Sequence, residues 1–573
     1  VKERVYMELE RLIKLARGEE TADLLLRNAR LVNVFSGEVY EANVAIAGPY
    51  VVGFGDYQAK REMDLRGHYL CPGLIDSHVH IESSMVSVPQ FARAVVPRGT
   101  TTVVCDPHEI ANVLGLEGIR YMLETSEDLP LTVYVMASSC VPATDLETSG
   151  AELSAEDLSP LFEEERVLGL AEMMNYPGVV FGVPEVLDKI RVAKGRPIDG
   201  HAPGLSGRDL TAYVAAGIGS DHECTTVGEA REKLRLGMRI LIREGTTSHN
   251  LRDLLPLVTP KNARRCAFCT DDRHPADLLD EGHIDYLVKT AIGMGLDPIT
   301  AIRMATLNTA EYFGLTDRGA IAPGRRADMV VFDNFEDFNV EMVFCNGELV
   351  AENGEMLPEV SIPSPAVPLS SMNVNWEKVK FKIPAKGRRA KVIQLIPHQI
   401  VAKGVVEEIK VEDGFAVADV GRDILKIAVI ERHRGTGNMG LGFVRGFGLR
   451  RGAIASSVAH DSHNIIVVGT SDEDMMAAAR EVAGMGGGLV AAEGGKVKAR
   501  LPLPIAGLMS DKPIEDVRAE MNKLLSAARE MGSKLDDPFM ALSFLALPVI
   551  PELKLTDKGL VDVNQFKLVP LFE

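Results

Sequence analysis

Strand-like and helix-like stretches alternate through the centre of the chain, and this alternation constrains the fold more than any other feature. Eight strand candidates follow one another at 74–80, 100–105, 131–137, 167–172, 197–201, 217–222, 238–243 and 266–271. Helical patterns, such as 88–96, 116–126 and 229–235, separate most of them. Such alternation is typical of a parallel α/β fold, and eight repeats in about 250 residues are the size of a TIM-type barrel. A doubly wound sheet is the alternative, but no glycine-rich dinucleotide loop opens the first βα turn.

The two flanks of this region have a different texture. Residues 22–70 and 319–356 alternate apolar and polar residues between turn signals, which is typical of short antiparallel strands. We therefore predict an α/β protein with a (β/α)8 barrel at 71–318 and one small β domain assembled from both flanks. Residues 1–70, which begin with an amphipathic helix, supply its first part, and 319–365 supply its second.

The C-terminal third begins after a stretch rich in proline and serine. We predict a linker at 366–384 and a separate α/β domain at 385–573, with strands at 417–430 and 464–469 and helices at 472–483 and 514–530. The glycine-rich segment 484–489 lies between a helix and a strand. Because no helix and no Lys-Ser/Thr pair follow it, a tight turn is favoured over a phosphate-binding loop.

Charge and cysteine content exclude several classes of function. A chain of 573 residues with a net charge of -19 lacks the basic footprint of a nucleic-acid-binding protein. No uncharged apolar run is long enough for a transmembrane helix, and the first 17 residues carry charges throughout, unlike a signal peptide. Seven scattered cysteines are typical of reduced thiols. We predict a cytoplasmic protein with a small-molecule substrate, no nucleic-acid or membrane partner, and a homodimeric assembly.

The first strand candidate ends in a His-x-His pair, His78 and His80. Residues i and i+2 of a strand point to the same face, so both imidazoles can reach one metal ion. Taken alone, such a pair is more often two partly buried histidines at a strand end. The residues at the ends of the later strands decide between metal ligands and structural histidines.

Residues that can bind metal recur where the later strands end, which is the catalytic face of a barrel. In chain order they are His78, His80, Asp106, His108, Glu172, His201, His222 and Asp271. His201 alone could be a turn histidine, and Asp271 alone could cap a helix. Glu172 is harder to dismiss, because a carboxylate that ends a buried strand is costly unless it is paired or bound to metal. Together these residues predict a metal centre.

The number of ligands favours two metals. Four histidines and two carboxylates exceed the three ligands of a mononuclear catalytic zinc site, and they suit two ions bridged by a carboxylate. With imidazole and carboxylate donors alone, Mn²⁺, Fe²⁺ and Zn²⁺ are all chemically acceptable.

Cys266 and Cys269 form a Cys-x-x-Cys motif of the kind found in zinc and redox sites. If 266–271 is a strand, however, the two sulfurs project from opposite faces, with Cα atoms about 10 Å apart. We therefore predict that both thiols pack in the barrel.

Several motifs carry a resemblance to a known family. The segments Pro72–His80, Thr309–Leu315 and Gly319–Val331 resemble the amidohydrolase superfamily. Six further segments and one C-terminal stretch are similar to the adenine deaminase family in particular; they are His80–Met85, Asp106–Val113, Gly169–Val179, Asp199–Gly204, Ser220–Glu223, Cys269–Arg273 and Ser456–Asn464.

This resemblance implies a (β/α)8 barrel, a binuclear manganese or iron centre, and hydrolysis of adenine to hypoxanthine and ammonia by a metal-bound hydroxide, in purine salvage or catabolism. His78 and His80 would bind one metal, and His201 and His222 the other. Glu172, in place of the carboxylated lysine of many relatives, would bridge them. Asp271 would complete the ligand set and carry protons. Further candidates for contacts to the purine or to the ligands are Asp106, His108, Glu109, Glu223 and Asp272.

Three questions stay open at this level. Another amidohydrolase, acting on a cyclic amide or an N-acetyl group, would share the same barrel and metals. A non-catalytic scaffold is disfavoured because no ligand position is missing. The segment His460–Asn464 either closes over the barrel mouth or forms a polar turn at a domain or subunit contact, and the turn is slightly favoured.

Overall fold

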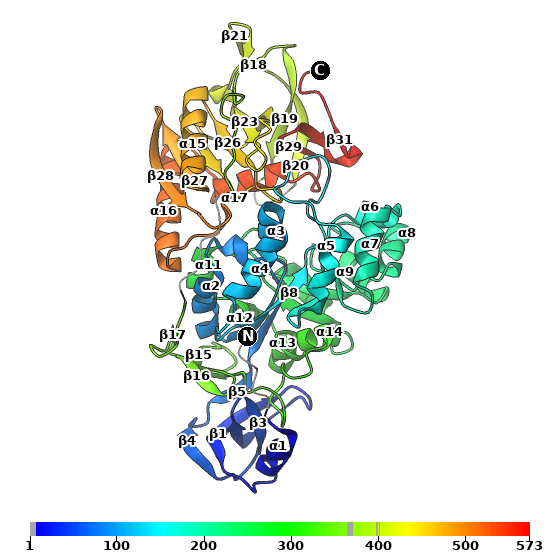
Figure 1. Ribbon diagram of the computed structural model, residues 1–573, viewed down its shortest axis with the longest axis vertical. Helices are drawn as coiled ribbons and strands as arrows, with labels where there is room; N and C mark the ends of the chain where they lie inside the picture. The colour runs from blue at the N-terminus through cyan, green and yellow to red at the C-terminus, as the bar shows by residue number, and fades with distance from the viewer. Residues whose placement is uncertain (1–6, 364–370, 397–398, 400) are drawn as a thin grey trace.

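The computed structural model describes residues 7–363, 371–396, 399 and 401–573. Three sections follow one another along the long axis of the molecule (Figure 1). A β section lies at the bottom, an α/β section in the middle, and the C-terminal section at the top. The predicted N-terminal helix is α1 (Leu9–Ala16), and residues 1–6 of that prediction lie outside the described part of the chain.

Strands from both flanks of the central region form one mixed sheet, in the order β17-β16-β15-β14-β5-β1-β2-β3, with β4 paired to β1. Strands β5 and β14 join the two flanks, and Cys71 lies opposite Val330 in their antiparallel register. Leu26, Val44 and Val331 are buried in the core of this sheet. The strands are β1 (Ala22–Asn33), β2 (Glu38–Ala47), β3 (Tyr50–Phe54), β4 (Ala59–Asp64), β5 (Tyr69–Pro72), β14 (Met329–Phe332), β15 (Val340–Cys345), β16 (Glu348–Glu352) and β17 (Glu355–Met356).

Each of the eight predicted central strands is present. They are β6 (Leu74–Val79), β7 (Thr100–Cys105), β8 (Thr132–Ala137), β9 (Val167–Met173), β10 (Ile198–Gly200), β11 (Ser220–Asp221), β12 (Arg239–Arg243) and β13 (Cys266–Cys269). All pair in parallel, within the sheets β10-β9-β8-β7-β6 and β11-β12-β13. Most of their residues are buried, which explains why the sequences of these strands are continuous apolar runs.

Hydrogen bonds link the two sheets at both junctions. Between β6 and β13, the N–H of Asp271 donates to the oxygen of His78 at 3.0 Å, and the N–H of His80 donates to the oxygen of Asp271 at 3.1 Å. Between β10 and β11 the described residues form no ladder, and the N–H of Gly219 donates to the oxygen of Ile198 at 2.9 Å. The central section is therefore a parallel α/β structure whose ladder is interrupted between β10 and β11 and reduced to one bridge, Val79 with Asp271, between β6 and β13.

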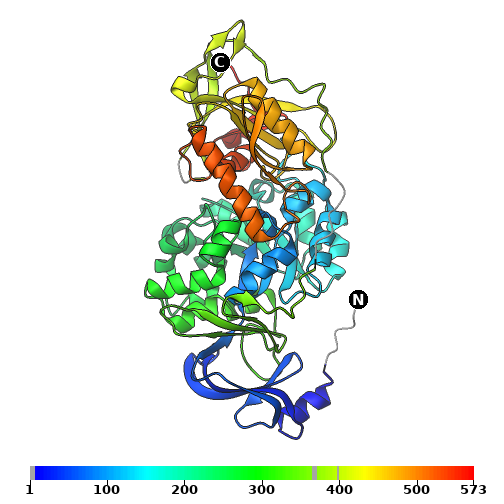
Figure 2. The same cartoon turned by 90° about the vertical axis from the view of Figure 1, so that its left-hand side faces the viewer.

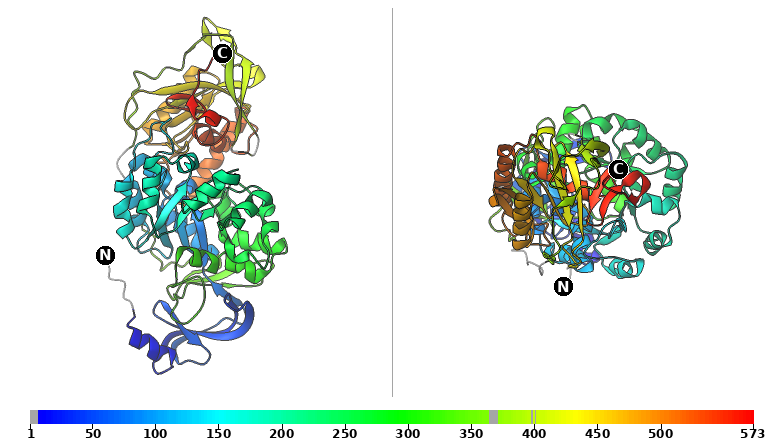
Figure 3. Two further views of the ribbon diagram at one scale, coloured as in Figure 1. Left: turned by 90° about the vertical axis from the view of Figure 1, so that its right-hand side faces the viewer. Right: turned by 90° about the horizontal axis from the view of Figure 1, so that it is seen from above.

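Helices surround these strands (Figures 1 and 3). They are α2 (Val88–Val95), α3 (His108–Leu114), α4 (Leu116–Thr125), α5 (Ala155–Leu158), α6 (Tyr176–Val180), α7 (Pro184–Val192), α8 (Gly207–Ala215), α9 (Val227–Arg235), α10 (Leu251–Leu254), α11 (Pro275–Asp280), α12 (Ile284–Gly293), α13 (Pro298–Met304) and α14 (Leu307–Phe313). Local sequence sets several helix starts. Thr226, for example, caps α9 by accepting the N–H of Glu229.

The C-terminal section contains one large sheet with the strand order β20-β19-β24-β23-β26-β25-β27-β28. Its strands are β19 (Arg389–Leu395), β20 (Ala402–Glu408), β23 (Ile424–Ile430), β24 (Met439–Arg445), β25 (Ala453–Ser456), β26 (Ile465–Gly469), β27 (Gly488–Glu493) and β28 (Lys496–Pro502). Two small sheets contain β18 (Ile383–Pro384), β21 (Val411–Glu412), β22 (Phe415–Ala416), β29 (Leu553–Thr556), β30 (Gly559–Asp562) and β31 (Lys567–Leu568). The helices are α15 (Asp472–Gly484), α16 (Ile514–Glu530) and α17 (Pro538–Ser543).

The C-terminal section differs in detail from two of the sequence predictions and matches a third. The strand expected at 417–430 begins only at Ile424, because a 3-10 turn precedes it and Asp423 adopts a left-handed conformation. The glycine-rich segment after α15 is the expected turn into β27. The predicted linker is partly structured, since Val379 and Phe381 are buried against the large sheet. Residues 366–370 of that linker lie outside the described part.

Helix α16 connects the C-terminal and central sections (Figure 2). It packs against α2 and α11. Glu515 pairs with Arg93 at 2.8 Å, and Arg518 pairs with Asp280 at 2.8 Å. The C-terminal section is thus held against the helices that surround the central strands.

Two further findings bear on membranes and thiols. Among the described residues, no helix is both long and apolar enough to cross a bilayer. The seven cysteines are buried free thiols. Cys266 and Cys269 lie in different hydrophobic clusters, as the packing interpretation requires.

A buried lysine stabilises the junction where the strand ladder is interrupted. Lys233 of α9 donates to the oxygen of Ala202 at 2.7 Å and to the carboxylate of Asp221 at 3.0 Å. Burial would raise the pKa of Asp221, but the charges of Lys233 and His222, with hydrogen bonds from Cys224 and Lys233, together lower it. The ion pair therefore ties the loop after β10 to the end of β11.

We predict that Lys233→Met lowers the free energy of unfolding by about 3–5 kcal/mol, because it leaves the Asp221 carboxylate buried without its cation. Guanidinium unfolding followed by circular dichroism measures the change. The exposed Lys194→Met is the matched control and should stay within about 0.5 kcal/mol of the parent protein. Equal stability of the two variants would contradict the role given to Lys233.

Candidate metal centre

The predicted ligands meet at the carboxyl ends of the central strands. His78 lies in β6 and Glu172 in β9, while His201, His222 and Asp271 follow β10, β11 and β13 within two residues. The carboxyl ends of parallel strands share one edge of the fold, so residues far apart in sequence converge there. Asp271 has a φ of 58°, a left-handed conformation that aspartate tolerates better than most residues.

Glu172 lies between two pairs of histidines. Its Oε1 is 3.2 Å from His80 Nε2 and 3.9 Å from His78 Nε2. Its Oε2 is 2.6 Å from His201 Nδ1 and 3.2 Å from His222 Nε2. Burial would raise the pKa of Glu172, but the charges of His201 and His222 outweigh it and hold the pKa well below its ordinary value. One carboxylate oxygen thus faces each pair.

Asp271 faces the first pair of histidines and an arginine. Its Oδ1 is 3.0 Å from His80 Nε2 and 3.5 Å from His78 Nε2. Its Oδ2 accepts a hydrogen bond from Arg243 at 2.8 Å. Burial alone would raise the pKa of Asp271, but Arg243 and the two histidines lower it well below its usual range. Asp271 therefore remains a carboxylate and is fixed in orientation.

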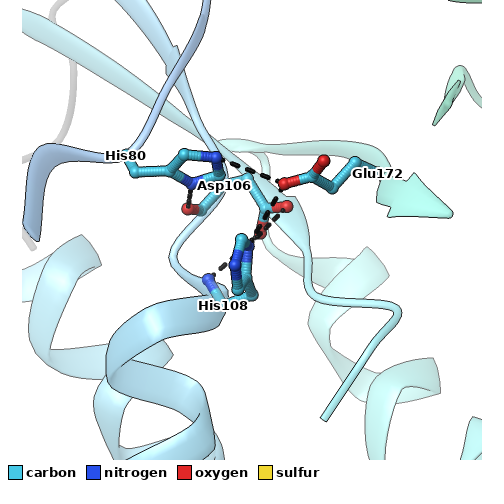
Figure 4. Close-up of side chains that lie close together, drawn as sticks. All are labelled: His80, Asp106, His108 and Glu172. Carbon is cyan, nitrogen blue, oxygen red and sulfur yellow. Dashed lines mark hydrogen bonds and ion pairs between the residues drawn. The ribbon is translucent and has the colours of Figure 1, made fainter. Parts of the chain in front are cut away.

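Asp106 and His108 lie beside this centre (Figure 4). His80 Nδ1 donates to the backbone oxygen of Asp106 at 2.9 Å, which leaves Nε2 of that ring facing Glu172. His108 Nδ1 is 3.2 Å from the Asp106 carboxylate and 3.5 Å from Glu172 Oε1. Donor atoms of His80, Asp106, His108 and Glu172 all lie within 4.8 Å of one another. This pair could therefore orient the ligands or bind an ion itself.

The three remaining candidates also border the centre. Glu223 pairs with Arg243 and lies 3.6 Å from His222 Nε2. Asp272 accepts a hydrogen bond from Ser83. Burial and the neighbouring Asp271 charge raise the pKa of Asp272. Glu109 contacts the C-terminal section and is described below.

The donor set fits divalent cations. The Nε2 atoms of His78 and His80 lie only 3.2 Å apart, and both face the same carboxylate oxygens. These two histidines and Glu172 are at most 4% exposed. Buried lone pairs that converge in this way are costly without a cation or shared protons between them. His78, His80, Glu172, His201, His222 and Asp271 are therefore the residues that could hold metal.

A small cavity of about 40 Å³ opens onto these ligands. Its other wall comes from the C-terminal section, through His460, Asp461, Phe544, Leu547 and Ile550. Of the two interpretations of the segment 460–464, the structure supports closure over the strand ends. The polar turn that the sequence slightly favoured is therefore an incomplete description, because the turn also lines the cavity.

Sequence reasoning missed Arg243 and Phe544. Arg243 ends the seventh predicted strand. A search of the strand ends for cationic side chains, as well as for metal-binding ones, would have identified it. Phe544 follows α17 in a segment without any motif. Only the contact between the sections places it at the cavity.

Comparisons with known proteins agree with this architecture. The profile described as "Amidohydrolase family" matches residues 69–350, which include the candidate ligands. The profile described as "Adenine deaminase C-terminal domain" matches residues 399–567. The first match defines the class of protein, a metal-dependent hydrolase superfamily whose motifs the sequence already resembles.

The relatives narrow this class. The chain is 57% identical to "Adenine deaminase" of Desulfatibacillum aliphaticivorans over 98% of this chain and 100% of that protein. It is 53% identical to "Adenine deaminase 2" of Carboxydothermus hydrogenoformans and 52% identical to "Adenine deaminase" of Methanothrix thermoacetophila, covering at least 98% of each chain. The chain belongs to the adenine deaminase family, and the resemblance read from its motifs is confirmed.

We predict that Glu172→Gln preserves the fold but loses bound metal and at least about 100-fold of the activity, because a neutral amide cannot supply the negative charge that Glu172 would offer to a bound cation. Elemental analysis after Mn²⁺ reconstitution should give about two ions per parent chain. The exposed Glu117→Gln serves as the control and should keep them. A Glu172→Gln protein with full metal and normal activity would make Glu172 a purely structural carboxylate.

Proposed function

We propose that the protein hydrolyses adenine to hypoxanthine and ammonia in purine salvage or catabolism. The observation that carries this proposal is the position of Glu172 between two histidine pairs, in a chain whose relatives are named adenine deaminase over their whole length. The eight strands would form a closed (β/α)8 barrel, supported by the links between β6 and β13 and between β10 and β11.

Two divalent cations complete the proposed site. His78 and His80 would hold one and His201 and His222 the other, with Glu172 between them and Asp271 on the first. Nitrogen and oxygen donors without thiolate suit Mn²⁺ or Fe²⁺, and Zn²⁺ is also acceptable. When bound, such ions lower the pKa of water and stabilise negative charge on the substrate.

The protein's own groups would handle the protons. As a C6–O bond forms and the C6–N bond to the amine breaks, the attacking water gives up two protons, one to ring N1 and one to the departing amine. Asp271 is the proposed carrier, since its Oδ1 faces the ligands while Arg243 holds Oδ2. Arg243 also helps to keep Asp271 ionised, so Oδ1 is available to accept a proton.

The shape of the site favours the free base over the nucleoside. Phe544, Leu547 and Ile550, which form an apolar roof from the C-terminal section, line the same cavity as the candidate ligands. A planar base can be enclosed there more easily than a base that carries ribose. If adenosine bound there, each polar group buried beside its ribose without a hydrogen-bond partner would cost roughly 1–3 kcal/mol, which would lower kcat/KM for adenosine.

The proposal extends to the setting of the enzyme. We place it in the cytoplasm as a homodimer, with a β domain at 1–70 and 319–365, a barrel at 71–318, a linker within 366–384 and a C-terminal domain at 385–573. Seven buried free thiols support a reducing compartment.

We predict that the Mn²⁺-reconstituted protein releases ammonia from adenine with a kcat/KM about 10- to 100-fold higher than for adenosine. A coupled ammonia assay on both purines, with hydantoin ring opening followed in parallel, measures the preference. Equal or faster turnover of adenosine would show that the free base is not the preferred substrate class. Opening of hydantoin without ammonia from adenine would indicate a different amidohydrolase activity.

A further inference from the structure

Two histidines of the C-terminal section hold the carboxylate of Glu109. His460 Nδ1 contacts Oε1 of Glu109, and His463 Nε2 contacts Oε2. All three side chains are at least 95% buried. Glu109 lies in α3, directly after His108, so this contact ties the C-terminal section to the edge of the metal centre.

The hydrogen bonds at His463 argue against a third metal at this cluster. His463 Nδ1 accepts the backbone N–H of Ala459 at 3.1 Å, so Nδ1 carries no proton. In the neutral ring the proton must then be on Nε2, which donates to Glu109. A metal ion bound to Nε2 would require removal of that proton. Because Nδ1 already accepts the N–H of Ala459 and carries no proton, the ring would then have to be an imidazolate anion. The cluster is therefore a hydrogen-bonded anchor, although its two imidazoles and one carboxylate lie close enough to hold an ion.

His460 differs from His463 because it lines the cavity. Its Nδ1 donates to Glu109, and its ring stacks on Phe544 with centroids 4.8 Å apart and an interplanar angle of 14°. Among the described residues, Nε2 of His460 has no hydrogen-bond partner. Orientation of one ring nitrogen by a carboxylate fixes where the other nitrogen points.

The charge on His460 fits a hydrogen-bond donor. Burial would lower the pKa of His460, but the Glu109 carboxylate, together with the charges of Asp272 and Asp461, outweighs burial and raises it to about 9. With both nitrogens protonated, Nε2–H is left to donate. Adenine offers three ring nitrogens with in-plane lone pairs, N1, N3 and N7, and among the described residues none accepts a hydrogen bond from this nitrogen.

We propose that His460, oriented by Glu109 and Phe544, donates a hydrogen bond from Nε2–H to a ring nitrogen of adenine in the cavity. The C-terminal section would then supply a substrate-binding group to a site whose metal ligands all come from the central section. This inference rests on the proposed deamination of adenine. The bond withdraws electron density from the ring, which assists addition at C6.

The test combines one substitution with three purine analogues, each of which lacks a different ring nitrogen. His460→Phe keeps a planar ring beside Phe544 but cannot donate. Dissociation constants of 1-, 3- and 7-deazaadenine are measured by calorimetry on the Mn²⁺-loaded parent and variant, together with kcat/KM for adenine. His460→Gln restores a donor, and His463→Gln is the matched control, because His463 contacts Glu109 without lining the cavity.

We expect His460→Phe to lower kcat/KM for adenine about 10- to 100-fold and to weaken two of the three analogues by a similar factor. The third analogue, which lacks the accepting nitrogen, should bind parent and variant equally. His460→Gln should recover part of the loss, and His463→Gln should not distinguish the analogues. Metal content and circular dichroism of each variant should match the parent.

Either of two outcomes would overturn the inference. Unchanged binding of all three analogues by His460→Phe would show that His460 does not touch the purine. An equal loss for all three would show a structural role. If parent and His460→Phe differ in the expected pattern but the parent releases no ammonia from adenine, the proposed function is contradicted and this contact stays established. A parent protein that binds none of these purines would contradict both.

Discussion

A buried carboxylate surrounded by imidazoles is the constraint on which this structure depends. Glu172 is 3% exposed at the end of a buried strand, where an unpaired charge is strongly unfavourable. Four histidine nitrogens, two on each side, compensate that charge within 3.9 Å. These histidines can surround Glu172 only if the ends of β6, β9, β10 and β11 meet at one place. The geometry of the site therefore depends on the parallel arrangement of these strands.

A second layer of charges keeps these groups in place. Arg243 bridges Glu223 and Asp271, and Lys233 fixes the adjacent Asp221. These cations are as buried as the groups they neutralise. The C-terminal section completes the enclosure through its contacts with Glu109 and through the apolar roof of the cavity.

Much of this arrangement could be predicted from the sequence. The strand period and the polar residue at each strand end located the central strands and put His78, His80, Glu172, His201 and His222 at one edge, because parallel topology leaves few alternatives. The strand expected from 417 was less accurate, since β-rich sequence alone does not show that a 3-10 turn and the left-handed Asp423 delay the start of the strand to Ile424. Long-range contacts were beyond the sequence: nothing local indicates that His460 meets Glu109, 351 residues away.

The central claim is that Glu172 separates two metal positions, and anomalous diffraction from crystals of the Mn²⁺-loaded protein tests it most directly. The account predicts two anomalous peaks, one beside His78 and His80 and the other beside His201 and His222, with the Glu172 carboxylate between them. A single peak, or two peaks on the same side of Glu172, would contradict it.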